Sequence, residues 1–211
     1  MKVWFQKFNN SFKDRNFVTS LLVGLLFLFI SLVINFIAGT YATEKASLPV
    51  TDIILSNIRV FDVDAIFIYG PVIFWTFAGL VLLYNPKKIP FTLKSIALFV
   101  VVRSIFISLT HIGPFPTQAI ISSSDFFSKF TFGGDLFFSG HTGLPFLMAL
   151  IFWREKELRY IFITSSLIFG AVVLMGHLHY SIDVLAAFFI TYTIFHMAEF
   201  FFKKERSMFL D

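Results

Sequence analysis

Two histidines and one aspartate have the residue types and the spacing for nucleophilic chemistry. His179 and Asp183 are spaced i and i+4, so they share a face and can hydrogen-bond if a helix begins by Tyr180. A carboxylate on one imidazole nitrogen fixes the tautomer and leaves the other nitrogen as a nucleophile or a base. His141 lies earlier in the chain and can meet His179 if the residues between them form a hairpin of two helices. Together, the three residues indicate acid–base and nucleophilic catalysis.

An anion site is expected beside these histidines. Ser139 is a good N-cap for a helix that begins just before His141. The free backbone N–H groups that follow it, together with the helix dipole, attract a negatively charged group. The combination favours phosphoryl transfer, in which His179 attacks phosphorus and His141 protonates the departing oxygen and later deprotonates the acceptor. A lone histidine at a helix end is more often a capping or interfacial group, so the prediction depends on the residues together.

The composition indicates that these residues belong to a membrane protein. Of the 211 residues, 57% are hydrophobic, 32 are Phe and only 14% are charged, whereas an ordinary soluble domain has about 25% charged residues. A bilayer core about 30 Å thick is crossed by roughly 20 apolar residues in a helix. Six runs near that length are separated by polar breaks: 17–38, 65–84, 91–110, 137–153, 160–178 and 184–202. We therefore expect an all-α fold, a bundle of six transmembrane helices.

The basic residues orient this bundle. If the amino terminus is cytoplasmic, 13 of the 17 Lys and Arg residues lie in the inner segments, which are 1–16, 85–94, 154–159 and 203–211. The positive-inside rule then predicts that both termini are cytoplasmic (N-in, C-in) and that the two histidines and Asp183 lie at the outer face. The net charge of +4 is thus explained by basic residues that face the cytoplasm, and we expect no nucleic acid as a partner.

The same pattern predicts one membrane domain, residues 17–202, between a cytoplasmic amino-terminal segment, 1–16, and a basic cytoplasmic tail, 203–211. In the first segment, aromatic residues recur every four positions beside two lysines, as in a helix lying on the membrane surface; these residues are Trp4, Lys7, Phe8, Phe12 and Lys13. A disordered tail is the alternative. The first apolar run is longer than the h-region of a signal peptide, so we expect a retained helix.

Two further polar residues need a reason to lie within or beside the membrane. Arg103 lies well inside the third run, and we expect it to bind phosphate, with a structural tie to a carbonyl or to Asp135 as the alternative. His177 is interpreted either as an aid to phosphate binding or as an interfacial residue. The chain has no Cys, which excludes disulfides, thiolate metal sites and a thiol nucleophile. No set of metal ligands is evident.

Longer motifs around these residues resemble a known family. Gly134-Asp135, followed after three residues by Ser139-Gly140-His141-Thr142, is similar to the third signature block of the sphingomyelin synthase family. His179-Tyr180-Ser181-Ile182-Asp183-Val184 is similar to its fourth block. Arg103 and Thr110 resemble the end of the second block, and Pro49 and Asp52 weakly resemble the first. This family belongs to the wider lipid phosphate phosphatase (PAP2) superfamily, so the resemblance also implies a PAP2-like bundle.

The resemblance implies a role for each matched residue. His179 would be the nucleophile that forms a phosphohistidine, Asp183 would support it, and His141 would act as acid and base. The donor would be a glycerophospholipid such as phosphatidylcholine or phosphatidylethanolamine, the acceptor ceramide or a diacylglycerol-like lipid, and no cofactor would be needed. We expect substrate contacts from Arg103, Asp135, Ser139, Gly140, Thr142, His177 and Tyr180.

Departures from the family pattern leave alternatives open. Gly133 stands where the family usually has Cys, and the paired Arg of the second block is absent, which leaves the donor headgroup undetermined. The main alternative is a PAP2-type lipid phosphate phosphatase, but the chain has no Arg-Pro pair, and Val172 and Val173 lie where such enzymes have Ser-Arg. A phosphomonoester carries close to two negative charges and a phosphodiester one, so Arg103 alone favours a diester. A non-catalytic membrane scaffold or transporter is the alternative of another class.

The location follows from the same comparison. The compact chain lacks the amino-terminal extension of larger animal members of the family. We therefore expect a bacterial inner membrane protein whose site faces the periplasm or exterior, with a eukaryotic Golgi or plasma membrane as the alternative. Membrane lipids are the expected partners, and assembly into a homo-oligomer is compatible with the sequence.

Overall fold

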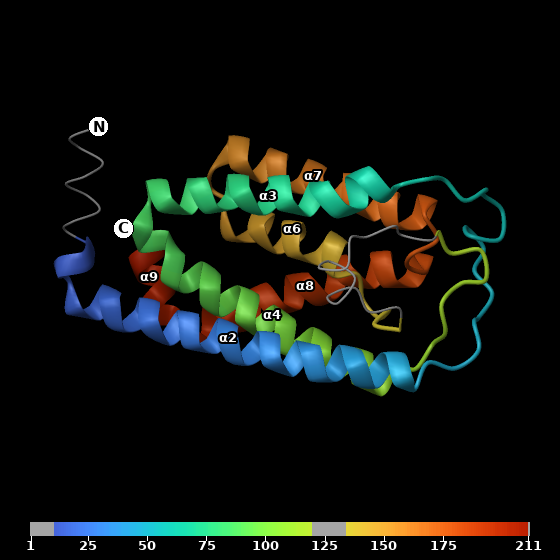
Figure 1. The fold of residues 1–211 in the computed structure, drawn as a ribbon. Helices are drawn as coiled ribbons and strands as arrows, with labels where there is room; N and C mark the ends of the chain where they lie inside the picture. Colours follow the sequence, from blue (N-terminus) through green and yellow to red (C-terminus); the bar gives the residue numbers. More distant parts are fainter. Residues whose placement is uncertain (1–10, 120–133, 211) are drawn as a thin grey trace.

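The chain forms a bundle of helices (Figure 1). The computed structural model describes residues 11–119 and 134–210, and no strand occurs within these two ranges. The helices are α2 (Arg15–Glu44), α3 (Asp64–Tyr84), the 3-10 turn η1 (Pro86–Lys88), α4 (Ile89–Leu109), α6 (Gly140–Ile151), α7 (Lys156–Met175), α8 (Ser181–Phe201) and α9 (Lys203–Leu210). The prediction of an all-α fold is confirmed for the described residues. Most of the expected surface helix at the amino terminus, residues 1–10, lies outside them.

Five of the described helices are long and apolar enough to cross a membrane: α2, α3, η1 with α4, α7 and α8. The fourth predicted run, 137–153, contains instead the 12-residue helix α6, which at 1.5 Å per residue spans about 18 Å of a hydrocarbon core about 30 Å thick. Leu147, Met148 and Ala149 of this helix have no exposed area. Helix α6 is therefore a buried central helix, and a full-length sixth span is not seen in the described residues.

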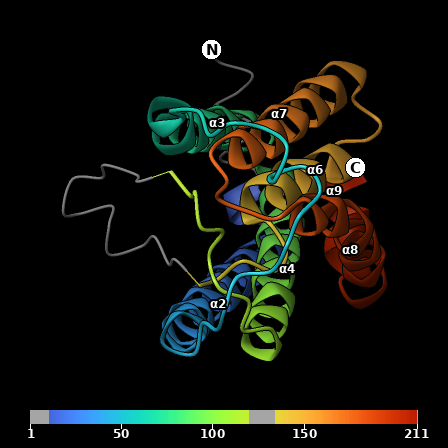
Figure 2. The same ribbon diagram turned by 90° about the vertical axis from the view of Figure 1, so that its right-hand side faces the viewer.

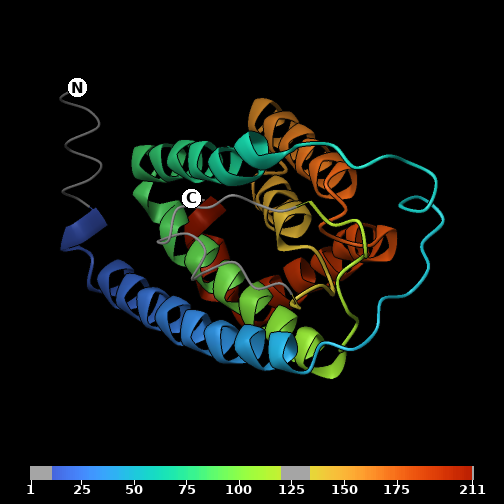
Figure 3. The same ribbon diagram turned by 45° about the vertical axis from the view of Figure 1, so that its right-hand side comes forward.

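The packing of the helices gives the bundle two different ends. Helix α2 packs along α4, while α6 packs against α7 and α8, and α3 against α7. The start of α2 and helix α9 lie at one end (Figure 1). The long connections 45–63 and 110–119 gather at the other end, which faces the viewer in Figure 2. Figure 3 shows the connection 45–63 crossing that end from α2 to α3. This loop end is where the predicted catalytic residues lie.

Close packing around α6 depends on a glycine. A Cβ atom added at Gly143 would lie 2.7 Å from two ring atoms of Phe99 and 2.9 Å from Oγ1 of Thr191. No side chain larger than hydrogen fits at such distances without a shift of its neighbours. Gly143 thus lets α6 approach α4 and α8 closely, in a core where Phe99 and Phe138 are fully buried.

The segment predicted as a basic tail, 203–211, contains the packed helix α9, Lys203–Leu210. Helix α9 packs against α4, and its Glu205 is 6% exposed. The carboxylate accepts hydrogen bonds from Nζ of Lys94, at 2.6 Å, and from Oγ of Ser20, at 3.0 Å. Three helices, α2, α4 and α9, are therefore joined by one buried ionic group at the end opposite the loops.

Candidate active site

His179 lies in a short turn between α7 and α8, which we call the His179 turn (residues 176–181). Helix α7 ends in a Schellman motif, because the N–H of His177 donates to the carbonyl of Leu174 and the N–H of Leu178 to that of Val173. His177 takes the left-handed position of this motif, with φ 53°, where glycine is the usual residue. The motif reverses the chain at the loop end and directs residues 178–181 back toward the bundle.

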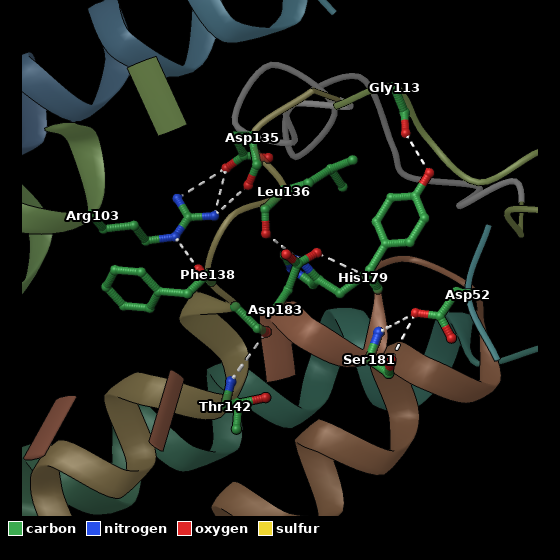
Figure 4. A network of polar contacts seen from close by, with 12 residues as sticks. Asp52, Arg103, Gly113, Asp135, Leu136, Phe138, Thr142, His179, Ser181 and Asp183 are labelled. Carbon is green, nitrogen blue, oxygen red and sulfur yellow. Dashed lines mark hydrogen bonds and ion pairs between the residues drawn. The ribbon is translucent and has the colours of Figure 1, made fainter. Parts of the chain in front are cut away.

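The ring of His179 is held by an acceptor that the sequence did not indicate. Its Nδ1 lies 2.8 Å from the carbonyl oxygen of Leu136 and 3.5 Å from Oδ2 of Asp183 (Figure 4). A carbonyl can only accept, so Nδ1 carries the hydrogen and Nε2 has the free lone pair. Within the described part of the chain, no hydrogen bond engages Nε2. His179 is thus in the tautomer required of a nucleophile that attacks through Nε2.

Asp183 is fully buried beside this ring. Helix α8 begins at Ser181, and Asp183 is its third residue, so its Oδ2 also accepts the N–H of Tyr180 at 2.9 Å in a capping box. His179 precedes helix α8. The pair of His179 and Asp183 therefore joins the turn to the first turn of the helix, and the two residues do not lie on a common helix face. Oδ1 has no hydrogen-bond partner among the described residues.

His141 is the second residue of α6 and faces α3. Its ring stacks on Phe67, with centroids 4.3 Å apart and an interplanar angle of 23°. It lies within electrostatic range of both His179 and Arg103. The hairpin of α6 and α7 returns the chain to the loop end, as the argument from spacing required, so both histidines belong to one cluster.

Arg103 of α4 is engaged in the structural tie that was the alternative to phosphate binding. Nε donates to the carbonyl of Phe138 at 2.9 Å, and Nη2 to that of Asp135 at 2.6 Å. Nη1 and Nη2 both donate to Oδ2 of Asp135, each at 3.1 Å (Figure 4). These four bonds use four of the five N–H groups of a guanidinium. One N–H on Nη1 is left for which the described residues supply no acceptor, and phosphate binding by Arg103 stays a prediction.

The start of α6 has the geometry expected of an anion site. Ser139 is the N-cap, and its Oγ accepts the N–H of Thr142 at 3.4 Å. The N–H groups of Gly140 and His141 open the helix and have no partner within it. The guanidinium of Arg103 lies over Gly140, since an added Cβ would be 3.5 Å from Nε of Arg103. Two free backbone donors and one remaining guanidinium donor thus lie near the two histidines.

Thr142, predicted as a substrate contact, is fully buried. Its carbonyl accepts a hydrogen bond from Oγ of Ser166 at 2.7 Å, which ties α6 to α7. Its Oγ1 has no hydrogen-bond partner among the described residues. The backbone of Thr142 therefore has a packing role in this structure.

Tyr180 and His177, also predicted to contact substrate, have hydrogen-bond partners within the protein. Tyr180 is 1% exposed, and its hydroxyl donates to the carbonyl of Gly113 at 2.7 Å and accepts the N–H of Val50 at 3.2 Å. His177 is 2% exposed, and its Nδ1 lies 2.6 Å from Oγ1 of Thr117. Both side chains join the His179 turn to the connections 45–63 and 110–119, and their contact with substrate stays a prediction.

Asp52 also belongs to the site, although it was not identified as a site residue from the sequence. Its Oδ2 accepts the N–H and the hydroxyl of Ser181 at 2.7 Å and 2.8 Å, and its Oδ1 accepts the N–H groups of Ile54 and Leu55. Burial alone would raise the pKa of this carboxyl, but the hydrogen bonds from Leu55, Ser181 and Ile54 hold the pKa below its ordinary value of 3.8. The only signal in the sequence was its weak match to the first signature block.

An open apolar groove begins beside Ser181. It has a volume of about 360 Å³ and is lined by Ile54, Leu174, Ser181, Ile182, Val184, Leu185 and Phe188. No group of three or more His, Cys, Asp or Glu side chains among the described residues could hold a metal ion.

Comparison with known proteins supports a superfamily for this arrangement. Residues 133–200 match the family model described as the PAP2 superfamily C-terminal region. The match supports the PAP2 superfamily, which is made up of phosphatases and phosphotransferases, so an enzyme is plausible. The matched range includes Asp135, His141, His179 and Asp183. No curated protein and no solved structure matches the chain.

Proposed function

We propose that the chain is an integral membrane phosphotransferase that moves a phospho-headgroup from a glycerophospholipid to ceramide or a similar lipid alcohol. The observation that carries the proposal is the state of His179: its Nδ1 is held by the carbonyl of Leu136 beside the buried carboxylate of Asp183, which leaves Nε2 as a nucleophile. Among the phosphatases and phosphotransferases of the PAP2 superfamily, a diester substrate fits the charges of this site best.

The reaction takes two steps. Nε2 of His179 attacks the phosphorus of the donor, the bond from phosphorus to the diacylglycerol oxygen breaks, and His141 gives that oxygen a proton. The product is a phosphohistidine that carries the headgroup. His141 then takes the proton of the acceptor hydroxyl, the acceptor oxygen attacks phosphorus, and the bond from phosphorus to Nε2 breaks. Both histidines return to their starting protonation states.

The charges support a diester. The charge of Arg103 is offset by the carboxylate of Asp135, so the remaining attraction for an anion comes from one guanidinium N–H and the N–H groups at the start of α6. A diester with one negative charge suits this weak attraction better than a monoester with nearly two. The apolar groove beside Ser181 offers room for hydrocarbon next to the His179 turn.

We further propose that the site faces the outside of the membrane, as expected for a periplasmic face in a bacterial inner membrane. It lies at the loop end of the bundle, whereas Lys87, Lys88 and the basic residues of α9 lie at the opposite end (Figure 1). Positive charge marks the cytoplasmic side.

The decisive experiment is an assay for lipid-to-lipid transfer. Purified protein is incubated with labelled ceramide and with phosphatidylcholine, phosphatidylethanolamine and phosphatidic acid in turn, and both label transfer and free phosphate are followed. We expect transfer from a diester donor, a loss of at least about 10³-fold in His179→Ala and of about 10²- to 10⁴-fold in His141→Ala. His196→Ala is the matched control, because its ring is half-exposed and bonds to Glu199, and it should keep full activity.

Each other outcome selects an alternative. Phosphate release from phosphatidic acid without transfer to ceramide would identify a lipid phosphate phosphatase with water as the acceptor. Full transfer by His179→Ala would refute the phosphohistidine mechanism. Neither activity over a wide lipid panel would favour a scaffold or transporter.

A further inference from the structure

We propose that Asp52, in the connection between α2 and α3, is a positioning residue that holds His179 in its reactive place through Ser181. The inference rests on the proposed function, because it takes His179 as the nucleophile. Asp52 touches no reacting atom in the mechanism above and acts only through the turn that it holds.

The contacts of Asp52 suit this role. The residue is 8% exposed, and its two oxygens accept four hydrogen bonds. Oδ1 binds the N–H groups of Ile54 and Leu55, at 2.8 Å and 3.0 Å, which makes the carboxylate a rigid part of its own loop. Oδ2 binds the N–H and the hydroxyl of Ser181, at 2.7 Å and 2.8 Å (Figure 4). A negative group at the first residue of α8 is also favoured by the helix dipole.

The position of Ser181 links these contacts to the nucleophile. Ser181 is two residues beyond His179, and the residue between them, Tyr180, donates its N–H to Asp183. The ring of His179 is itself held at Nδ1 by Leu136. A shift of the start of α8 would therefore move the Cα of His179 against a fixed ring partner and turn Nε2 away from the phosphorus.

The other hydrogen bonds that join the connections to the end of α7 and to the His179 turn are neutral. The hydroxyl of Tyr180 bonds to the carbonyl of Gly113, and the N–H groups of Phe61 and Ala119 bond to the carbonyls of Met175 and Gly176, each at 2.9 Å. Hydrogen bonds to a charged group are roughly twice as strong as neutral ones. Asp52 thus supplies the charged hydrogen bonds that join the carboxyl-terminal side of the His179 turn to the connection between α2 and α3.

The experiment compares four variants of the full-length protein in the transfer assay. Asp52→Ala removes all four bonds and Ser181→Ala removes only the bond from the hydroxyl, while Asp52→Asn keeps one oxygen that can accept from Ser181. Asp62→Ala is the matched control, because Asp62 is an exposed carboxylate of the same connection whose one hydrogen-bond partner in the described part of the chain is the nearby N–H of Asp64.

We expect kcat to fall about 10- to 100-fold in Asp52→Ala, since displacement of a catalytic group by about 1 Å can cost that much, with KM changed less than about threefold. Asp52→Asn should recover part of kcat, Ser181→Ala should lose about threefold, and Asp62→Ala should match the unchanged protein. A rise in KM at constant kcat would overturn the proposal in favour of a substrate contact. Should Asp52→Ala fail to fold, unchanged kcat in both folded Asp52→Asn and Ser181→Ala would overturn it equally.

Amide hydrogen exchange separates this proposal from the proposed function. Peptides that cover residues 176–184 should exchange faster in Asp52→Ala than in Asp62→Ala, whether or not a substrate is known. If the unchanged protein neither transfers a headgroup nor releases phosphate, the proposed function fails. Faster exchange in Asp52→Ala would still show that Asp52 holds the turn. Equal exchange in the two variants would refute the positioning role.

Discussion

At the scale of single residues, the tautomer of His179 is fixed by a backbone group. The carbonyl of Leu136 lies closer to Nδ1 than the carboxylate of Asp183 does, at 2.8 Å against 3.5 Å. A backbone carbonyl keeps the hydrogen on Nδ1 even when the carboxylate is changed. In the proposed mechanism, the buried carboxylate of Asp183 would then serve mainly to stabilise positive charge on the ring as the phosphohistidine forms and breaks.

If Leu136 fixes the tautomer and Asp183 supplies the charge, Asp183→Asn should lower kcat less than His179→Ala does. The variant keeps the size of the side chain but loses its charge, so we expect kcat to fall by about 10- to 100-fold, because the tautomer survives. His179→Ala should lose far more. The measurement is kcat for both variants, with thermal unfolding as a check of the cap on Tyr180. Equal loss in both variants would contradict the assignment of the tautomer to Leu136.

At the scale of elements, helix α9 is held to the bundle by a buried ion pair. Glu205 and Lys94 are both less than one-tenth exposed, and the helix has only eight residues. Burial alone would raise the pKa of Glu205, but the hydrogen bonds from Lys94 and Ser20 hold it below the ordinary value of 4.5. The folded protein therefore favours the ionised carboxylate.

The pair predicts both a loss of stability and a pH dependence. At neutral pH, Glu205→Gln leaves the ammonium of Lys94 buried without its partner and should lower the free energy of unfolding by about 3–5 kcal/mol. Because the folded pKa lies below the unfolded one, the contribution is full above pH 4.5 and is lost as the pH falls through the folded pKa. Unfolding temperatures of the two proteins in detergent should thus converge in acid.

The control for this prediction is Glu157→Gln, an exposed glutamate at the start of α7. It should leave the unfolding temperature within the small range typical of surface substitutions. An equal effect of both glutamine variants, or a constant difference between Glu205→Gln and the unchanged protein at all pH values, would show that the buried pair does not hold α9.

At the scale of the whole molecule, the two ends of the bundle differ in chemistry. The loop end carries His141, His179, Asp183 and the connections that cover them, while the other end carries η1 and α9 with their lysines and Arg206 (Figure 1). A membrane in which positive charge stays inside would place the loop end outside. A lipid phosphate at the membrane surface would then lie near the start of α6.

The absence of Cys from the chain makes this orientation simple to test. A cysteine at the exposed Ser56, in the connection between α2 and α3, should react in intact cells with a thiol reagent that does not cross membranes. A cysteine at the exposed Lys156, at the start of α7, should react only after the membrane is opened. The reverse pattern would place the site at the cytoplasmic face.

Hydropathy and charge are local properties, and they were enough to predict an all-α membrane bundle and the end at which the histidines lie. Hydropathy predicted a membrane span over 137–153, but the helix in this run is shorter. Ser139 caps α6 inside the run, and the helix ends at Ile151. From Gly143 to Trp153 the run also contains only apolar residues and glycine, which suit a buried core as well as they suit lipid. Local pattern cannot distinguish these two apolar surroundings.

The sequence by itself determined which residues could do chemistry, since the types and spacing of His141, His179 and Asp183 are written in it. Only the tertiary structure decided what holds them. Leu136 meets His179 across 43 positions, Asp135 meets Arg103 across 32, and Asp52 meets Ser181 across 129. All three pairs include a hydrogen bond to a backbone atom. Every residue has these atoms, so the residue type does not predict such contacts. They arise from the way the helices pack and the connections cross the loop end.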